Sequence, residues 1–199
     1  MTPIEAAGAG GLAGFAGAAL AHVLSIYLSR HGGAEWLHGP FGPPFFAAAL
    51  YTGIFYGSIG AAAGRRAAAV GLLGGLLGLL VPLYVLTRYG GWTPSQWRYV
   101  MLAAYILAIW GTIAGIGAAV ARKPWRGAAA AVLGSLAGYV VLAGCLALYH
   151  SVRGHANGMA VEGAPSLLPP LVNLLDGLLS GAGLCLALSL EGRLSRRTS

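Results

Sequence analysis

Charged residues are scarce in this chain. Aspartate, glutamate, lysine and arginine together make up 9% of its 199 residues, whereas a soluble globular domain has about 25%. This deficit excludes an ordinary water-soluble core, and a chain of this length has room for one membrane domain. The 12 basic residues outnumber the 5 acidic ones, but they stand in short turns between apolar stretches rather than in one patch or tail. We therefore expect no nucleic-acid partner.

Cysteine is scarce too, with Cys145 and Cys185 as the only two and no C-x-x-C spacing. The two lie inside apolar stretches at different depths, which excludes a disulfide between them and favours a packing role. The chain lacks a phosphate-binding or dinucleotide-binding glycine motif, paired aspartates, an intramembrane serine–histidine pair and a histidine pair for haem. We expect neither an enzyme nor a bound cofactor.

Long apolar runs are what the chain does have. Residues of the types AVILMFWYC make up 57%, and the mean hydropathy is +0.74. About 20 helical residues cross a hydrocarbon core of about 30 Å. The sequence therefore predicts an all-α, polytopic membrane protein, a bundle of six transmembrane helices that forms a single integral membrane domain over residues 1–199. The predicted helices are 4–28, 44–64, 67–88, 99–121, 127–149 and 166–190.

The basic residues predict the orientation of this bundle. Eight of them fall on the side of the two termini: Arg65, Arg66, Arg122, Lys123, Arg126, Arg193, Arg196 and Arg197. Four fall on the opposite side: Arg30, Arg88, Arg98 and Arg153. Because positive charge is retained in the cytoplasm, we expect cytoplasmic N and C termini in a multi-pass protein of the plasma (inner) membrane, with the lipid bilayer as its surroundings.

Each predicted helix contains a G-x-x-x-G motif, which places two glycines on one face and lets helix backbones approach closely in lipid. The pairs are Gly10/Gly14, Gly53/Gly57, Gly71/Gly75, Gly111/Gly115, Gly134/Gly138 and Gly177/Gly181. We interpret them as helix-packing residues. Such faces also suit a homo-oligomer or a larger membrane complex.

Part of the chain reads as a tandem repeat. Residues 58–66 align with 115–123, and after a three-residue insertion residues 74–78 align with 134–138. The second and third helices therefore look like a duplicate of the fourth and fifth, related as a parallel repeat. The first and sixth helices then lie outside the repeat.

Asp176 is the sharpest candidate for a site because it lies near the middle of the sixth helix. A carboxylate at the bilayer midplane costs about 2.5–3.5 kcal/mol on insertion scales and is rarely there without a partner or a cavity. Asn173 and Ser180 share its helix face. His22 falls at a similar depth in the first helix. A His22–Asp176 pair would carry protons in one interpretation and fix helix register by a buried hydrogen bond in the other.

The remaining histidines lie on the outer side and are weak candidates for a divalent metal, since imidazole suits zinc, nickel and copper. They are His31, His38, His150 and His155. Their spacing matches no defined metal motif, so no metal site is predicted.

Function is predicted from these features as a small permease or transport-system subunit for a small solute or ion, with an intramembrane Asp/His site. The alternative is a non-catalytic structural or assembly subunit of a larger membrane complex that packs through its glycine faces. A transporter should keep Asp176 in a water-accessible cavity, whereas a scaffold should bury it in a dry contact or point it at a partner chain.

Overall fold

The computed structural model describes residues 1–31, 43–89, 94–156 and 168–197, and within these ranges it holds helices and no strand. This confirms the predicted all-helical fold. The largest differences from the predicted boundaries are at the ends of the last two helices, which continue further. The helices are α1 (Pro3–His31), α2 (Pro43–Ala63), α3 (Arg65–Tyr89), α4 (Pro94–Val120), α5 (Pro124–Ala156) and α6 (Leu168–Arg197).

Local sequence explains where the helices begin. The start of α1 has a capping box, in which the Thr2 amide donates to the Glu5 carboxylate (2.7 Å) and the Glu5 amide donates to the Thr2 hydroxyl (3.2 Å). Gly64 alone separates α2 from α3, with a φ of 136° that suits glycine. Proline has no amide to leave unpaired at a helix start. It opens four of the helices, at Pro3, Pro43, Pro94 and Pro124.

Four of the helices are long and apolar enough to cross a membrane. The corresponding segments are Pro3–Leu24, Leu102–Val120, Pro124–Tyr149 and Leu171–Leu194. Their outward faces carry large apolar side chains, such as Leu12, Leu107 and Leu148, which are exposed by 70%, 73% and 66%. So much exposed apolar surface does not suit a monomer in water, and it indicates a membrane protein.

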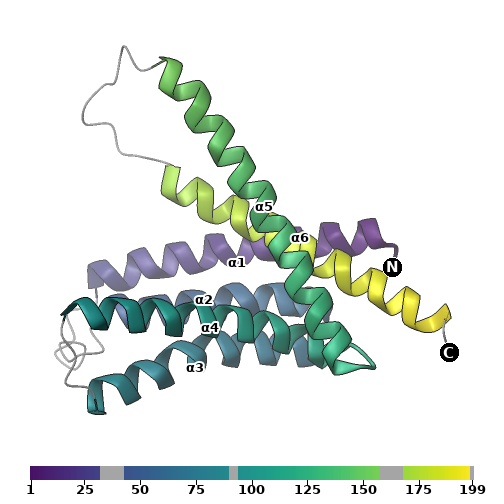
Figure 1. The fold of residues 1–199 in the computed structure, drawn as a ribbon, viewed down its shortest axis with the longest axis horizontal. Helices are drawn as coiled ribbons and strands as arrows, with labels where there is room; N and C mark the ends of the chain where they lie inside the picture. The colour runs from purple at the N-terminus through teal and green to yellow at the C-terminus, as the bar shows by residue number, and fades with distance from the viewer. Residues whose placement is uncertain (32–42, 90–93, 157–167, 198–199) are drawn as a thin grey trace.

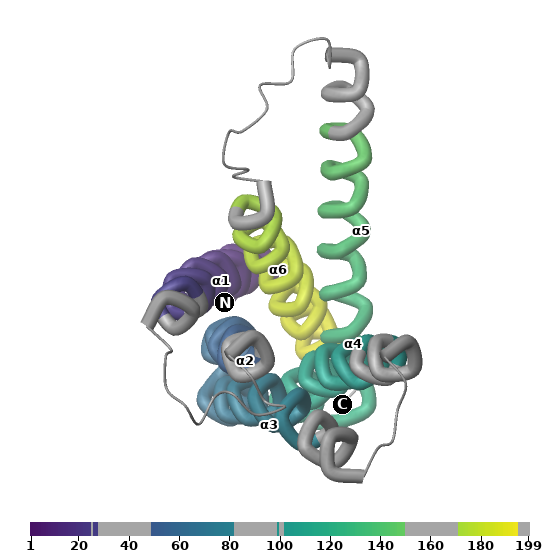
Figure 2. Tube along the Cα trace, turned by 90° about the vertical axis from the view of Figure 1, so that its left-hand side faces the viewer, coloured from purple at the N-terminus to yellow at the C-terminus, as the bar shows by residue number. Residues whose placement is uncertain are grey.

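Helices that follow one another in the chain pack side by side, and α6 returns to pack on α1 (Figure 1). The contacts of α1 with α6 and of α2 with α3 are the most extensive. Helix α5 crosses α6 obliquely and then rises away from α1–α4, as both ribbon and tube show (Figures 1 and 2). The ring of helices is therefore tight where α5 crosses α6 and opens beyond that crossing.

The core lies where α2, α4 and α6 meet across the ring. Ile59 of α2, Ile116 of α4 and Leu184 of α6 are buried to 1% exposure or less. Phe55 and Tyr56 of α2 join this cluster. The interior is thus packed at its centre.

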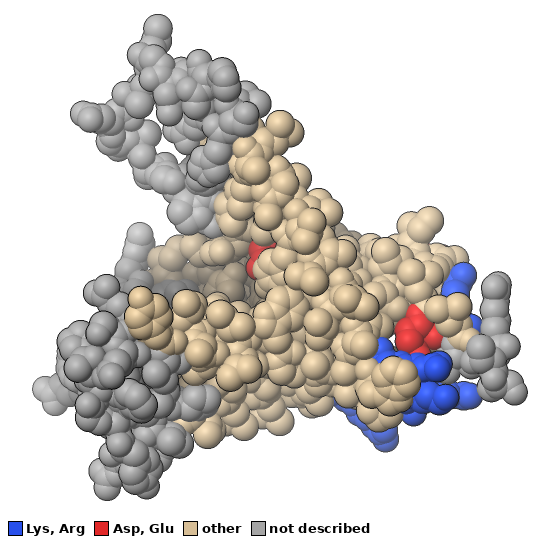
Figure 3. All heavy atoms as spheres, in the orientation of Figure 1, with Lys and Arg blue, Asp and Glu red and all other residues tan. Residues whose placement is uncertain are grey.

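One end of the molecule gathers the α2–α3 turn, the α4–α5 turn and both chain termini (Figure 1). Lysine and arginine side chains cluster there around a few acidic atoms, whereas almost all of the remaining coloured surface is uncharged (Figure 3). We call it the basic end. Its described basic side chains are Arg65, Arg66, Arg122, Lys123, Arg126 and Arg193.

Candidate functional site

Asp176 is held in place by backbone contacts on both sides of α6. Toward α1, a Cβ added at Gly177 would lie 2.7 Å from the carbonyl carbon of Gly14. Toward α5, a Cβ added at Gly138 would lie 2.7 Å from the carbonyl carbon of Leu179. Such distances are possible only for glycine. The register of α6 against both neighbours is therefore fixed within one turn of Asp176.

The Asp176 side chain is half-buried, and its Oδ1 atom is buried without a hydrogen-bond partner among the described residues. Buried polar atoms are nearly always hydrogen-bonded, so an orphaned carboxyl oxygen requires an explanation. In space-filling view, acidic atoms lie at the floor of the hollow between α5–α6 and the other helices, far from the basic end (Figure 3). Asp176 is the only described acidic residue away from the helix ends, because Glu5 and Glu191 lie near the chain termini.

Four tyrosines on three other helices lie within electrostatic reach of this carboxyl. Asp176 interacts electrostatically with Tyr51 and Tyr56 of α2, Tyr105 of α4 and Tyr139 of α5. The Tyr56 and Tyr139 side chains also hydrogen-bond to each other. A phenolic hydroxyl both donates and accepts. The arrangement is therefore one carboxyl with four phenols, contributed by four of the six helices.

Three of these tyrosine rings, those of Tyr51, Tyr56 and Tyr139, pack against other aromatic rings. Tyr51 stacks on Phe55 with ring centroids 5.9 Å apart, and Phe55 meets Tyr56 edge to face at 4.9 Å. Tyr139 meets Trp110 at 5.9 Å, also edge to face. These separations are in the favourable range for aromatic pairs. The phenols are thus held by their rings.

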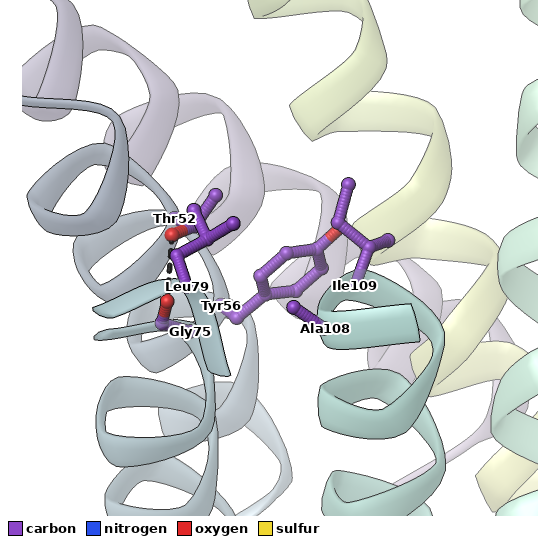
Figure 4. A pocket seen from close by; sticks show the side chains of 6 residues that line it. All are labelled: Thr52, Tyr56, Gly75, Leu79, Ala108 and Ile109. Carbon is purple, nitrogen blue, oxygen red and sulfur yellow. Dashed lines mark hydrogen bonds between the residues drawn. The ribbon is translucent and has the colours of Figure 1, made fainter. Parts of the chain in front are cut away.

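Tyr56 is also wedged between α3 and α4 (Figure 4). The crevice around it holds about 140 Å³ of empty space, too narrow for a water molecule, and is lined by Gly75 and Leu79 of α3 and by Ala108 and Ile109 of α4. At its edge the Thr52 hydroxyl donates to the Gly75 carbonyl at 2.8 Å and joins α2 to α3. Dry packing on both sides fixes where the Tyr56 hydroxyl points.

The polar face predicted on α6 is present. The buried Ser180 hydroxyl donates to the backbone carbonyl of Asp176 and lies beside the Asp176 carboxyl, while Oδ1 stays unpaired. Asn173, one turn earlier, is half-buried. Ser180 therefore supports the helix as well as the site, since serine commonly bonds the carbonyl four residues back.

The structure does not bring His22 beside Asp176. The two helices are neighbours, as the pairing requires, but Gly14 is the residue that lies opposite Gly177. His22 is eight residues further along α1, which is about 12 Å along the helix axis. Counting residues from the outer ends of the two helices suggested a similar depth, whereas the crossing point of the helices sets their actual register.

The weak metal candidates cannot be placed as ligands. His38 lies outside the described residues, and for His31, His150 and His155 only the helical backbone is described. Among the described side chains, no three His, Cys, Asp or Glu residues gather at one point.

Most predicted packing glycines lie at helix contacts. Gly10, Gly14, Gly177 and Gly181 meet at the α1–α6 crossing, Gly53, Gly57, Gly71 and Gly75 lie between α2 and α3, Gly134 and Gly138 face α6, and Gly115 faces Val70. Gly111, by contrast, has open space where a Cβ would stand. Gly117 and Gly127, outside the motifs, bring α4 and α5 together instead.

The tyrosines are the part of the site that sequence reasoning missed. Tyrosine in a membrane protein is enriched at the two interfaces, yet Tyr51, Tyr56, Tyr105 and Tyr139 lie well inside their predicted segments. That placement is a usable signal, because a phenol at mid-depth needs a hydrogen-bond partner.

No protein-family model, curated protein or solved structure matches this chain. Its function must therefore be inferred from its own residues, above all from those around Asp176.

Proposed function

We propose that this chain is a small membrane permease or transport-system subunit, without enzymatic activity, that moves a small solute or ion past Asp176. The observation that carries the proposal is the buried, unpaired Oδ1 of a mid-helix carboxyl among phenols from α2, α4 and α5. A purely structural carboxyl would be expected to have both oxygens satisfied. Intramembrane ionisable residues typically mark ion or substrate pathways.

The chemistry of the site favours positive charge. A carboxylate attracts a proton or a small cation. The phenol oxygens of Tyr56 and Tyr139 can accept a hydrogen bond from the protonated carboxyl or coordinate a bound cation. The faces of the aromatic rings also attract cations. Ser180 and Asn173 complete the polar face of α6. Asp176, Asn173 and Ser180 are therefore the site residues on α6, and the tyrosines take the partner role that the sequence suggested for His22.

The membrane placement that we propose has six spans. Helices α2 and α3 have 21 and 25 residues, which is about 31 and 37 Å of helix and enough to cross the bilayer with their four neighbours. The basic end supports a cytoplasmic location for both termini, and the plasma (inner) membrane remains the proposed location.

A duplication of the α2–α3 hairpin as α4–α5 is also part of the proposal. Aligned residues make the same contact near each turn. A Cβ at Gly60 would lie 2.6 Å from the Ala67 carbonyl carbon, and a Cβ at the aligned Gly117 would lie 2.6 Å from that of Gly127. The aligned isoleucines, Ile59 and Ile116, are both core residues. This equivalence supports a parallel repeat with α1 and α6 as the added pair.

Flux measurements in liposomes test the transport role. Purified full-length protein is reconstituted with a pH-sensitive dye inside, and proton flux is followed under imposed proton, Na⁺ or K⁺ gradients. Asp176→Asn should lower the initial rate about tenfold or more, since contacts to a charged group contribute roughly 1.5–3 kcal/mol. Glu191→Gln removes a carboxylate from the basic end of the same helix and should leave the rate unchanged. Equal rates for the native protein and Asp176→Asn contradict the proposal.

The alternative is a non-catalytic subunit of a larger membrane complex. It is favoured by the way α5 rises from the bundle with Val140 and Val141 exposed by 64% and 51%. In that case Asp176 would point to a partner chain. Native mass spectrometry of membrane extracts shows whether other chains are bound, and the Asp176→Asn variant then separates the two, because only a transport role makes the flux through the complex depend on that carboxyl.

A further inference from the structure

A second feature lies at the basic end, remote from Asp176. Helices α5 and α6 are in backbone contact at Gly134 and Gly183, where a Cβ on Gly134 would lie 2.8 Å from the Gly183 carbonyl carbon. From this crossing toward the basic end the two helices separate. A groove of about 440 Å³ opens between them. We call it the α5–α6 groove.

The groove has an apolar body and a polar mouth. Its lining includes the small residues Ala129 and Ala130 of α5 and the larger apolar residues Leu133 of α5 and Leu190 and Leu194 of α6. These leucines are exposed by 64%, 46% and 63%. The lining is continuous along about 12 Å of helix from Leu133 to Trp125, so it suits a hydrocarbon chain rather than a polar solute.

The groove opens at the basic end, and its own lining is balanced in charge. Arg126 and Glu191 lie at the groove itself, and the Arg126 guanidinium stands 5.2 Å from the ring centre of Trp125. Arg122 and Lys123 belong to the adjoining α4–α5 turn, and Arg193 follows on α6. The lining thus holds one basic and one acidic side chain, and the surplus of positive charge belongs to the basic end around the groove. A tryptophan beside an arginine is typical of the membrane–water interface, and arginine is well suited to bind a phosphate.

From this complementarity we propose that the α5–α6 groove binds one anionic phospholipid of the inner leaflet. One acyl chain lies along the alanine and leucine side chains of the lining, and the phosphate is held by Arg126. The inference rests on the proposed membrane placement, with the basic end at the headgroups, and is independent of transport through Asp176. The Glu191 carboxylate repels any second anionic group on the α6 side of the groove. The preference for an anionic lipid therefore depends on Arg126 and on the basic residues near it.

Native mass spectrometry of the full-length protein in detergent tests this. Phosphatidylglycerol and phosphatidylcholine with identical acyl chains are the probes. The native protein should retain phosphatidylglycerol preferentially. Arg126→Gln should reduce that preference about fivefold, the effect of one basic side chain at an anionic surface. Ala129→Phe, a change at an exposed position of the groove, should reduce retention of both lipids by filling the space for the acyl chain.

Two matched controls lie at the same end of the molecule but outside the groove. Arg65→Gln removes an exposed charge from α3, and Ala69→Phe adds a ring to an exposed position one turn later; both should retain lipid like the native protein. If Arg65→Gln reduces the preference for phosphatidylglycerol as much as Arg126→Gln does, a diffuse belt of charge binds the lipid and the groove is not the site. An unchanged preference in Arg126→Gln also contradicts the proposed site. Displacement of lipid by inorganic phosphate alone would also contradict it. If the protein discriminates between the two lipids but shows no transport, the lipid site is supported and the transport proposal is contradicted. If it transports but does not discriminate, the transport proposal is supported and the lipid site is contradicted.

Discussion

Gly14 of α1 and Gly177 of α6 lie so close together at the crossing of their helices that neither position has room for a side chain. A Cβ built on Gly14 would lie 2.7 Å from the Gly177 carbonyl carbon, and one built on Gly177 would lie 2.7 Å from that of Gly14. Lipid supplies no hydrophobic force between helices, so such van der Waals contact between backbones is a main source of association. The residue next to this crossing is Asp176, which ties the position of the carboxyl to the packing of α1.

The first prediction concerns this crossing. Gly14→Ala should destabilise the protein by about 1–3 kcal/mol, because overpacking forces the two helices apart. Gly8→Ala is the matched control on the same helix, since nothing lies within 4 Å of a Cβ there. It should be neutral or stabilise by up to about 1 kcal/mol, because alanine favours helix over glycine. Denaturant titration in mixed micelles measures both, and equal effects would mean that the crossing is unimportant.

The helices themselves could be predicted because their signals are local. Length and apolar composition lie within each segment, and the structure has its helices where those signals predict them. Helix α6 continues to Arg197, beyond its predicted end. Hydropathy marks where a helix leaves an apolar layer, not where its hydrogen bonds stop.

The site could be predicted only in part. Asp176 was evident as a charge in an apolar run. Its surroundings depend on which helices touch and at what register, and sequence spacing does not encode that. Counting residues from the helix ends suggested His22 as the partner of Asp176. The crossing at Gly14 instead places His22 about two helical turns away from the level of Asp176. The tyrosines come from helices far apart in the chain.

Topology supplies the second prediction. In a background with Cys145→Ala and Cys185→Ala, single cysteines at Arg66 and Arg122 should react with a membrane-impermeant maleimide only from the cytoplasmic side, because positive charge is retained there. A cysteine at Tyr99, exposed near the start of α4, should react only from the opposite side. Labelling intact cells and inverted vesicles distinguishes the two. Reaction of Arg66→Cys from outside would reverse the orientation.

The tyrosine hydroxyls give the third prediction. Tyr56→Phe and Tyr139→Phe keep the aromatic contacts but remove the hydrogen bond between the two phenols. Each should slow flux severalfold, up to about tenfold, as expected for loss of a contact of about 0.5–1.5 kcal/mol. Tyr99→Phe serves as the control because that side chain is 75% exposed. If all three variants transport at the native rate, the phenols are packing residues only.

The fourth prediction separates use of Asp176 from structural need. Its Oδ1 has no partner among the described residues, so replacing the carboxyl by an apolar side chain removes a desolvated group without breaking a bond to that atom. Asp176→Leu should therefore unfold at a denaturant concentration equal to or above that of the native protein, a gain of up to about 1–3 kcal/mol. It should nevertheless lose flux as completely as Asp176→Asn does. If Asp176→Leu is clearly less stable than the native protein, the carboxyl holds the helices together and the structural role is correct. If the variant is stable but has no flux, the free energy cost of burying the carboxyl serves transport.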